Sequence, residues 1–247
     1  MIDHRHSFGK RLSAQEKYRF PWRKSRLVQG RPAFFPGCNL INFLPETGRE
    51  VLRIFEGAGD GWMYDCCGKP LRGMGMKAEA EAVLARIARR LEQAEVTALV
   101  VACPNCLPVF EAGLSLPVMD IYTYLEERGI PCRTAPGERQ VFPPCPDRKE
   151  GRIRRAAEAW SRSALTPAQG LPCCGLGIPK ADAAKAALRK AVAGSAGLSP
   201  YCASCYGHLH RNGAQVRPHL LTEGLGLRET PAQGLALALN RLKPLGW

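Results

Sequence analysis

The chain of 247 residues is long enough for one large domain or two small ones, and it can bury a sizeable core without disulfide or metal staples. Its apolar content of 45% and charged content of 23% are those of a globular protein rather than a disordered or fibrous one. It contains no run of 18 apolar residues, and its first residues lack the apolar segment of a signal peptide. We therefore expect a cytoplasmic protein with no transmembrane segment.

The positive charge is concentrated at the N-terminus. The net charge is +13, and residues 1–31 carry nine Lys or Arg residues against two acids. This basic N-terminal arm suits a solvated segment, docking to an acidic protein partner, or binding to nucleic acid or an anionic membrane surface. The chain lacks a zinc-finger spacing, an aromatic-rich RNA-binding signature and a helix-turn-helix pattern, so we do not expect a nucleic-acid partner.

Strand and helix signals alternate along the first half of the chain. Short apolar runs predict strands, and apolar residues at i, i+3, i+4 and i+7 predict helices, most clearly for 77–95. The expected elements are a strand at 33–36, a helix at 49–57, a strand at 61–65, a helix at 77–95, strands at 96–102 and 117–121, and a helix at 122–129. Such alternation predicts a parallel sheet with right-handed crossovers.

The second half carries weaker signals. A strand at 140–144 and a helix at 180–193 are clear. The strands expected before Cys173 and Cys202 are poorly marked, and they are inferred from an internal repeat of the cysteines.

Ten of the eleven cysteines form two copies of the pattern C…CCG…CxxC. The second copy follows the first by 107 residues at the leading cysteine and at the CCG, and by 99 residues at the CxxC. The flanks repeat as well, with FFPGC and CPNC in the first copy and FPPC and CASC in the second. Cys132 stands outside both copies, and we interpret it as an unpaired structural cysteine.

The repeat predicts a duplicated α/β fold. We expect two pseudo-repeated halves, each a small parallel sheet flanked by helices, with the cysteine loops at the carboxyl ends of the strands. The seam falls in the Pro-, Gly- and charge-rich segment at 130–140. The expected domains are a basic arm at 1–31, a first half-domain at 32–135 and a second half-domain at 136–247.

Each half then brings five thiolates to one sheet edge. A structural zinc site takes four ligands, but its two knuckles normally lie closer together than the intervals of 27 and 35 residues in the first copy. A thioredoxin-like redox pair explains each CxxC but not the CCG. Iron–sulfur clusters are held by cysteine thiolates, and an ordinary four-iron cubane uses four, so the fifth is either spare or part of a larger cluster.

The doubled pattern, with FPGC, CCGKPL, CPNC and CCGLG, resembles the cysteine-rich CCG domain family, which includes the catalytic B subunit of heterodisulfide reductase. The resemblance covers about residues 33–210. It implies two iron–sulfur clusters, each a non-cubane 4Fe–4S cluster of two fused fragments that uses all five cysteines of one copy. The implied ligands are Cys38, Cys66, Cys67, Cys103 and Cys106 in the first copy and Cys145, Cys173, Cys174, Cys202 and Cys205 in the second.

The resemblance also explains the adjacent cysteines. A fused cluster needs two thiolates close together, and the glycine after each pair, Gly68 or Gly175, lets the backbone turn tightly beside the cofactor. One departure from the family is the second leading cysteine, where this chain has FPPCPD instead of the DPC that family members often have.

Two functions follow. The first is a disulfide reductase, in which two facing one-electron centres act through their cysteine ligands on a small disulfide or thiol substrate, with electrons from an iron–sulfur or flavin subunit. The second is a non-catalytic electron-transfer subunit of a larger dehydrogenase complex. Residues that differ between the copies either shape substrate preference or are surface charges; they are Lys69, Arg72, Lys180, His208 and His210.

Overall fold

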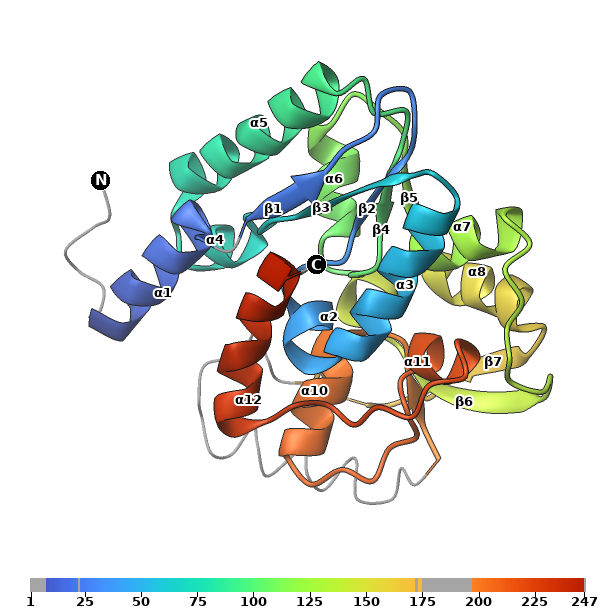
Figure 1. Cartoon of the computed structure of the whole chain (residues 1–247). Coiled ribbons are helices and arrows are strands. Elements are labelled where there is room, and N and C mark those ends of the chain that lie inside the picture. The colour runs from blue at the N-terminus through green and yellow to red at the C-terminus, as the bar shows by residue number, and fades with distance from the viewer. Residues whose placement is uncertain (1–7, 22, 172, 175–196, 247) are drawn as a thin grey trace.

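The strands form two sheets in the computed structural model, which describes residues 8–21, 23–171, 173–174 and 197–246 (Figure 1). The helix expected at 180–193 lies outside the described residues, as do Gly175 and Lys180. The helical segments, of which η1 and η2 are 3₁₀ helices, are α1 (Phe8–Arg19), α2 (Cys38–Phe43), α3 (Pro45–Gly57), α4 (Lys69–Gly73), α5 (Lys77–Gln93), α6 (Leu107–Gly113), α7 (Ile121–Glu127), η1 (Cys145–Asp147), α8 (Arg152–Ser161), α10 (Ala203–Arg211), α11 (Leu220–Gly224), α12 (Gly234–Leu239) and η2 (Asn240–Gly246).

The larger sheet has the strand order β1-β3-β2-β4-β5. Its strands are β1 (Lys24–Arg26), β2 (Ala33–Phe35), β3 (Gly61–Tyr64), β4 (Leu99–Val101) and β5 (Val118–Asp120). β2 pairs in parallel with β3 and with β4, and β4 pairs in parallel with β5. The chain leaves β2 for β3 on one side and later crosses to β4 on the other, so the strand order reverses at β2. Open α/β sheets bind ligands beside the carboxyl ends at such a point.

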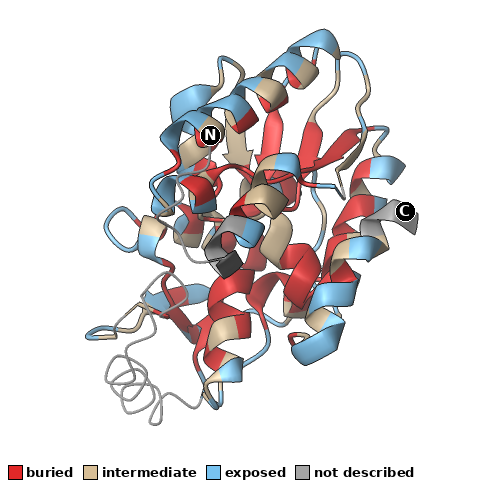
Figure 2. Ribbon diagram, turned by 90° about the vertical axis from the view of Figure 1, so that its left-hand side faces the viewer, coloured by how far each residue is buried: buried red, intermediate tan, exposed pale blue. Residues whose placement is uncertain are grey.

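Neighbouring side chains of β2 pack against opposite helical layers. The Phe34 ring stacks on Phe55 of α3 with 5.0 Å between centroids, and Phe55 stacks on Tyr124 of α7 at 4.1 Å. Phe35 meets Phe110 of α6 edge to face at 4.8 Å. Because both faces are covered, every residue of β2, β3 and β4 is buried (Figure 2). This explains why the strands of the first half read as continuous apolar runs.

The smaller sheet has the strand order β7-β6-β8, with both pairs parallel. Its strands are β6 (Glu138–Phe142), β7 (Ala164–Pro167) and β8 (Ser199–Pro200). β6 confirms the strand expected at 140–144, although it begins two residues earlier. The two residues of β8 explain why no strand signal stands out before Cys202.

The α/β class with parallel strands and helices is correct, but the expectation of two pseudo-repeated halves, each a small parallel sheet, is wrong. The first sheet is mixed and five-stranded, because β1 adds an antiparallel edge and β5 extends the other side. The second sheet has three strands in the described residues, and the chain beyond it forms α11, α12 and η2. One hydrophobic core also includes residues from both sheets, so the two parts pack as one body. The domain boundaries drawn from the sequence stay a prediction.

Part of the segment that we expect to form a basic arm is packed against the first sheet. β1 pairs with β3, with Ser25 opposite Met63. Ala14 of α1 and Phe20 are buried, and the Phe20 ring lies 5.0 Å from Tyr64 in an edge-to-face contact. Part of the basic segment therefore belongs to the fold.

Polar contacts join the C-terminal part of the chain to α3. The Glu229 carboxylate accepts hydrogen bonds from the backbone N–H groups of Glu46 at 2.9 Å and Thr47 at 2.8 Å, and from the Thr47 hydroxyl at 2.7 Å. These contacts satisfy two N–H groups that the first turn of a helix leaves without helical partners.

No helix in the described part of the chain has the length and apolar character needed to cross a membrane.

Helices α2 and α10 bring the two parts into direct contact. Asn39 Nδ2 donates to Ser204 Oγ at 2.7 Å. A Cβ atom added to Gly207 would lie 2.2 Å from Cδ1 of Phe43, so the ring fills the space that a side chain at position 207 would need. Each helix carries a cysteine of one copy, Cys38 or Cys205, and this contact therefore sets the distance between the two copies.

Gly207→Ala should lower the free energy of unfolding by about 1–3 kcal/mol, because the added methyl group forces the Phe43 ring or the helices apart. The change can be measured by urea denaturation of the reduced chain. Gly57→Ala in α3 is the matched control, since nothing lies within 4 Å of its added Cβ, and it should change stability by less than about 0.5 kcal/mol. Equal stabilities of the two variants would contradict the tight contact of α2 with α10.

Candidate functional site

The first leading cysteine is held close to the CPNC loop by a glycine. Cys38 begins α2 just after β2, and Gly37 before it has a φ of 71°. A Cβ on Gly37 would lie 2.7 Å from Cys103 Cβ and 3.6 Å from Cys106 Sγ. Only glycine tolerates both this φ and this approach, so the backbone at Gly37 can lie directly against the CxxC cysteines.

The CCG sequence follows β3. Cys66 and Cys67 are both buried, and Gly68 has a φ of 80° in the left-handed region at the start of α4. A Cβ on Gly68 would lie 3.0 Å from the carbonyl oxygen of Ala80 on α5. The glycine therefore provides both the turn that redirects the chain after the two cysteines and room for α5.

The five cysteines of the first copy are neighbours. The Cys106 thiol is hydrogen-bonded to Cys103 and Cys67, and these bonds, together with burial, raise its pKa. The same bond from Cys106 lowers the pKa of Cys67. Burial is the main cause that raises the pKa of Cys66, and the nearby Cys38 and Cys67 act in the same direction. Burial also raises the pKa of Cys38 to about 11.

The cysteines of the second copy form two adjoining contacts. Cys145 at the start of η1 lies with its Sγ 3.3 Å from Cys173 Sγ. The Cys205 thiol is hydrogen-bonded to Cys174 and Cys202, which raises the pKa of Cys205, and the bond to Cys205 lowers the pKa of Cys202. Cys173 belongs to the first contact and Cys174 to the second, and because these residues are consecutive, the backbone joins the two contacts. Cys145 is exposed, whereas Cys174, Cys202 and Cys205 are buried.

The two copies meet through the side chains of their loops. Lys69, directly after the first CCG, donates from Nζ to Asn105 Oδ1 at 2.8 Å. Asn105 of the first CPNC donates in turn from Nδ2 to Cys202 Sγ of the second copy at 3.8 Å. A cation of the first copy is thus connected through one amide to a sulfur of the second.

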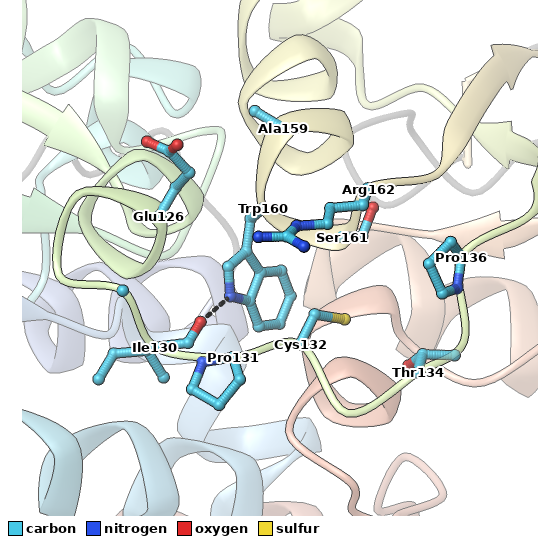
Figure 3. A pocket seen from close by; sticks show the side chains of 11 residues that line it. Glu126, Ile130, Pro131, Cys132, Thr134, Pro136, Ala159, Trp160, Ser161 and Arg162 are labelled. Carbon is cyan, nitrogen blue, oxygen red and sulfur yellow. Dashed lines mark hydrogen bonds between the residues drawn. The ribbon is translucent and has the colours of Figure 1, made fainter.

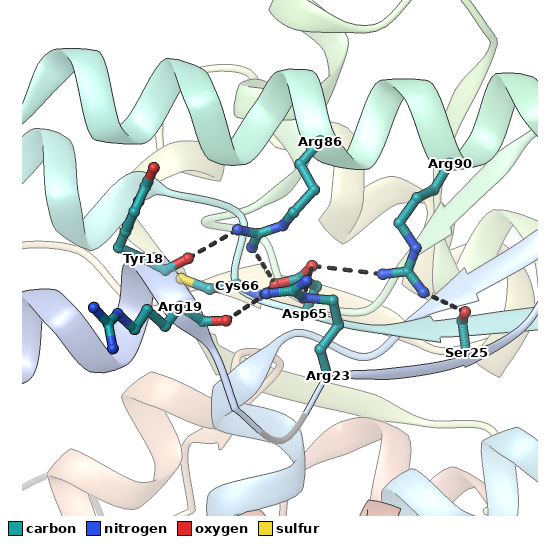
Figure 4. Close-up of polar contacts among 8 residues, drawn as sticks. All are labelled: Tyr18, Arg19, Arg23, Ser25, Asp65, Cys66, Arg86 and Arg90. Carbon is teal, nitrogen blue, oxygen red and sulfur yellow. Dashed lines mark hydrogen bonds and ion pairs between the residues drawn. The ribbon is translucent and has the colours of Figure 1, made fainter.

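A buried carboxylate anchors the first CCG. Asp65 Oδ1 accepts the N–H of Cys66 at 2.7 Å, and the carboxylate forms ion pairs with Arg23 at 3.1 Å, Arg86 at 2.8 Å and Arg90 at 3.7 Å (Figure 4). Burial raises the pKa of Asp65 above its ordinary value, although the arginines and the Cys66 N–H act against this shift. Three cations around one carboxylate leave a net positive field beside Cys66.

A further cation comes from α1. Burial acts to lower the pKa of Lys17, but the nearby Cys38 and Glu16 outweigh it and raise that pKa above its ordinary value. Sequence reasoning did not identify Asp65 or Lys17. The signal for Asp65 is a carboxylate at the end of an apolar strand, because a buried charge must be paired. Its three partners come from two other segments, which the pattern of residues does not reveal.

The other predicted residues lie around the site. His208 Nδ1 is hydrogen-bonded to the carbonyl oxygen of Cys174, and His210 Nδ1 lies 2.6 Å from Gln233 Nε2. Arg72 lies on α4, one turn after Lys69. Lys180 and Gly175 fall outside the described residues.

Cys132 lies apart from both copies, in agreement with its place outside the repeat. It lines a cavity of about 400 Å³ between α7, the segment at 129–136 and the end of α8 (Figure 3). The Trp160 indole closes one side, and its Nε1 donates to the carbonyl oxygen of Ile130 at 2.8 Å.

The donors present suit an iron–sulfur group. Each copy gathers thiols alone, and Lys17 and Lys69 lie near the first copy, where they can offset the charge of thiolates. Within residues 8–21, 23–171, 173–174 and 197–246, no three His, Cys, Asp or Glu side chains are arranged as ligands of a single metal ion. The cysteines of the first copy contact one another instead of surrounding one ion.

Residues 32–111 match the family model of the cysteine-rich domain called CCG. The matched residues contain the whole first C…CCG…CxxC pattern, and the second pattern lies beyond them. This match supports the resemblance of this part of the chain to CCG domains, and such a cysteine-rich domain suggests iron–sulfur binding and redox chemistry. A comparison with curated proteins gives no match.

Solved structures resemble the chain only loosely. A putative Asp/Glu racemase from Yersinia pestis is 14% identical, with a TM-score of 0.39 over 87% of this chain and 99% of that one. Glutamate racemase RacE1 from Bacillus anthracis is 16% identical, with a TM-score of 0.43 over 81% of this chain and 80% of that one. Both TM-scores are below 0.5, so these likenesses carry no argument about activity.

Asp65→Asn should lower the free energy of unfolding of the reduced chain by about 1–3 kcal/mol. The amide keeps the shape but leaves three arginines without their counter-charge, and their partial exposure limits the cost. Glu50→Gln is the control, because its pair with Arg53 is on the surface and is worth less than about 1 kcal/mol. If urea denaturation shows equal losses, the arginines do not depend on Asp65.

Proposed function

We propose that this chain is an iron–sulfur oxidoreductase of the heterodisulfide reductase B type, which reduces a small disulfide by using both cysteine copies together. Each copy would hold one cluster, of the non-cubane 4Fe–4S type, through its five cysteines. The group would supply one-electron transfer at sulfur. The ligands would be Cys38, Cys66, Cys67, Cys103 and Cys106 in one copy and Cys145, Cys173, Cys174, Cys202 and Cys205 in the other.

The observation that carries the proposal is the contact between the copies. Asn105 lies between the two CxxC cysteines of the first copy in the sequence and donates to Cys202 of the second, so the loops that carry the two sulfur groups are in contact. The second bond between the loops, from Asn39 to Ser204 at 2.7 Å, supports the same arrangement. Two centres this close can act on the two sulfur atoms of a single substrate, whereas separate electron carriers need no shared loop contact.

A disulfide RS–SR′ takes up two electrons and two protons, its S–S bond breaks, and RSH and R′SH leave. A partner subunit with an iron–sulfur or flavin centre supplies the electrons one at a time, and the solvent supplies the protons. Lys69 would offer a positive charge to one substrate sulfur while it is a thiolate, before the solvent protonates it, and Asn105 would offer an N–H to the other substrate sulfur.

The electron donor would present an acidic surface to this chain. The net charge of +13 favours association with a negative partner, and such attraction weakens as salt increases. We also place the reaction in a reducing compartment such as the cytoplasm, because the ligands must stay as thiolates.

Cys67→Ser and Cys174→Ser should each abolish turnover almost completely, and the double variant should be little slower than either alone. Residues that act as a unit have non-additive effects. Turnover can be measured anaerobically with reduced viologen and a panel of small disulfides. Iron and acid-labile sulfide should approach about eight irons per wild-type chain and about half of this in each single variant.

Cys132→Ser is the control, because Cys132 lies outside both copies, and it should retain both iron and turnover. Nearly full turnover in Cys174→Ser would refute the paired mechanism and favour an electron-transfer subunit. Stoichiometric zinc without sulfide would refute the iron–sulfur assignment itself.

A further inference from the structure

A pocket of about 520 Å³ lies beside the end of α11. Its wall is formed by residues 133–134, by Tyr206 of α10 and by parts of the segment 218–230. No cysteine lines it within the described part of the chain, so the pocket is distinct from the contacts between the thiols. Concave surfaces with a few fixed polar groups are typical of small-molecule sites.

The pocket contains two carboxylates, and both are engaged by other parts of the protein. Glu229 uses both of its oxygens to hold the first turn of α3. Glu223 pairs with Arg139 and, at 3.6 Å, with Arg217, and neither of these arginines lines the pocket. The negative charge in the wall is therefore largely balanced from outside the pocket.

The two arginines in the wall have no such partners. Arg133 and Arg228 are both exposed, and neither side chain forms a hydrogen bond or ion pair with another residue in the part of the chain that the structure describes. Because the carboxylates are already balanced, these two cations give the pocket a net positive charge. A guanidinium matches phosphate and carboxylate groups through two parallel hydrogen bonds, so the pocket suits an anion.

The fold fixes the position of Arg133. Its backbone N–H donates to the carbonyl oxygen of Gly224 at 2.7 Å. Gly226 has a φ of 75°, and a Cβ atom added there would lie 2.8 Å from Arg133 Cδ. The arginine stem thus crosses directly over the backbone of Gly226, where only glycine leaves room for it. A side chain that is held in this way loses less conformational entropy when a ligand binds.

We propose that this pocket binds a phosphate group between the guanidinium groups of Arg133 and Arg228, with the hydroxyl groups of Thr134 and Thr230 in the same wall as further donors. Phosphate is favoured over a single carboxylate, because it carries close to two negative charges at neutral pH and its oxygens can accept from both arginines. The group belongs either to a small phosphate ester or to inorganic phosphate. The site goes beyond the proposed function and does not depend on it.

A ligand at this position would connect two segments that are far apart in the chain. Arg133 lies in the segment that joins α7 to β6, whereas Arg228 is next to Glu229, which holds α3. A phosphate that contacts both arginines would fasten the C-terminal segment to this connection. A ligand that binds only the folded state stabilises it, so occupancy should raise the melting temperature.

The first test measures binding by isothermal titration calorimetry on the full chain purified anaerobically. The probes are inorganic phosphate, phenyl phosphate and benzoate, at constant ionic strength because surface attraction depends on salt. Wild-type protein should bind at least one of the two phosphates about tenfold more tightly than benzoate, because a second charged contact is added. Tighter binding of phenyl phosphate than of inorganic phosphate would indicate an ester as the ligand, and the reverse order would indicate the free ion.

Arg133→Gln and Arg228→Gln should each weaken phosphate binding about tenfold. Arg89→Gln is the matched control, since Arg89 is an exposed arginine on α5 outside the pocket, and it should bind phosphate as the wild type does. Gly226→Ala keeps both charges but displaces the stem of Arg133, so it should also weaken phosphate binding, by about fivefold. Saturating phosphate should raise the melting temperature of the wild type and not that of the double variant at positions 133 and 228.

The proposal fails if the wild type binds neither phosphate, if the phosphates bind no more tightly than benzoate, or if Arg133→Gln and Arg228→Gln bind as the wild type does. An equal loss in Arg89→Gln would also overturn it, because it would indicate attraction to overall charge. None of these measurements involves turnover. A chain that binds phosphate at both arginines but reduces no disulfide would keep this site and lose the proposed function.

Discussion

The parallel pairing of β2 with β3 and β4 is the constraint on which the first site depends. Parallel strands end at the same sheet edge, and in this sheet the three strands lead into Cys38, the Cys66–Cys67 pair and the CPNC loop. Gly37 brings two of these loops into contact, because its missing side chain lets the chain at Cys38 lie against Cys103 and Cys106. Sheet geometry and one close backbone approach together turn three distant segments into one group of thiols.

The two cysteine copies lie in different surroundings although their sequences repeat. Cys66, Cys67 and Cys106 belong to the main hydrophobic core, whereas Cys174, Cys202 and Cys205 belong to a small separate cluster with Phe142, Leu198 and Leu209. The first copy is also surrounded by cations from α1, α5 and the chain before β1. Positive groups beside thiolate-held iron favour the more reduced, more negative state, and burial opposes it. Clusters held by the two copies would therefore differ in redox behaviour because of their surroundings.

The basic segment at the N-terminus has a role that its composition does not suggest. Arg23 is committed to Asp65, and Lys17 lies beside Cys38, so part of the positive charge acts inside the protein. β1 completes this arrangement, because its pairing with β3 fixes the segment next to the strand that carries the first CCG. From the charge count alone, these residues are interpreted as a solvated or docking arm. In the structure, Arg23 pairs with Asp65 beside the first CCG, and Lys17 lies near Cys38.

The sequence by itself determined the repeated cysteine pattern and most of the elements that flank its first copy. The cysteine repeat, the buried strands and the helix at 77–95 appear as local patterns. Such patterns can be recognised before the fold is known, because they depend only on side-chain chemistry and on the spacing of residues along the chain. The tertiary structure decided what depends on distant partners: the antiparallel edge at β1, the unequal five-stranded and three-stranded sheets in place of two matching halves, and the three arginines on Asp65. It also decided that Asn105 of one copy touches Cys202 of the other. Contacts between segments far apart in the chain depend on how the helices and sheets pack on one another. That packing cannot be predicted from a pattern of residues that are neighbours in the sequence.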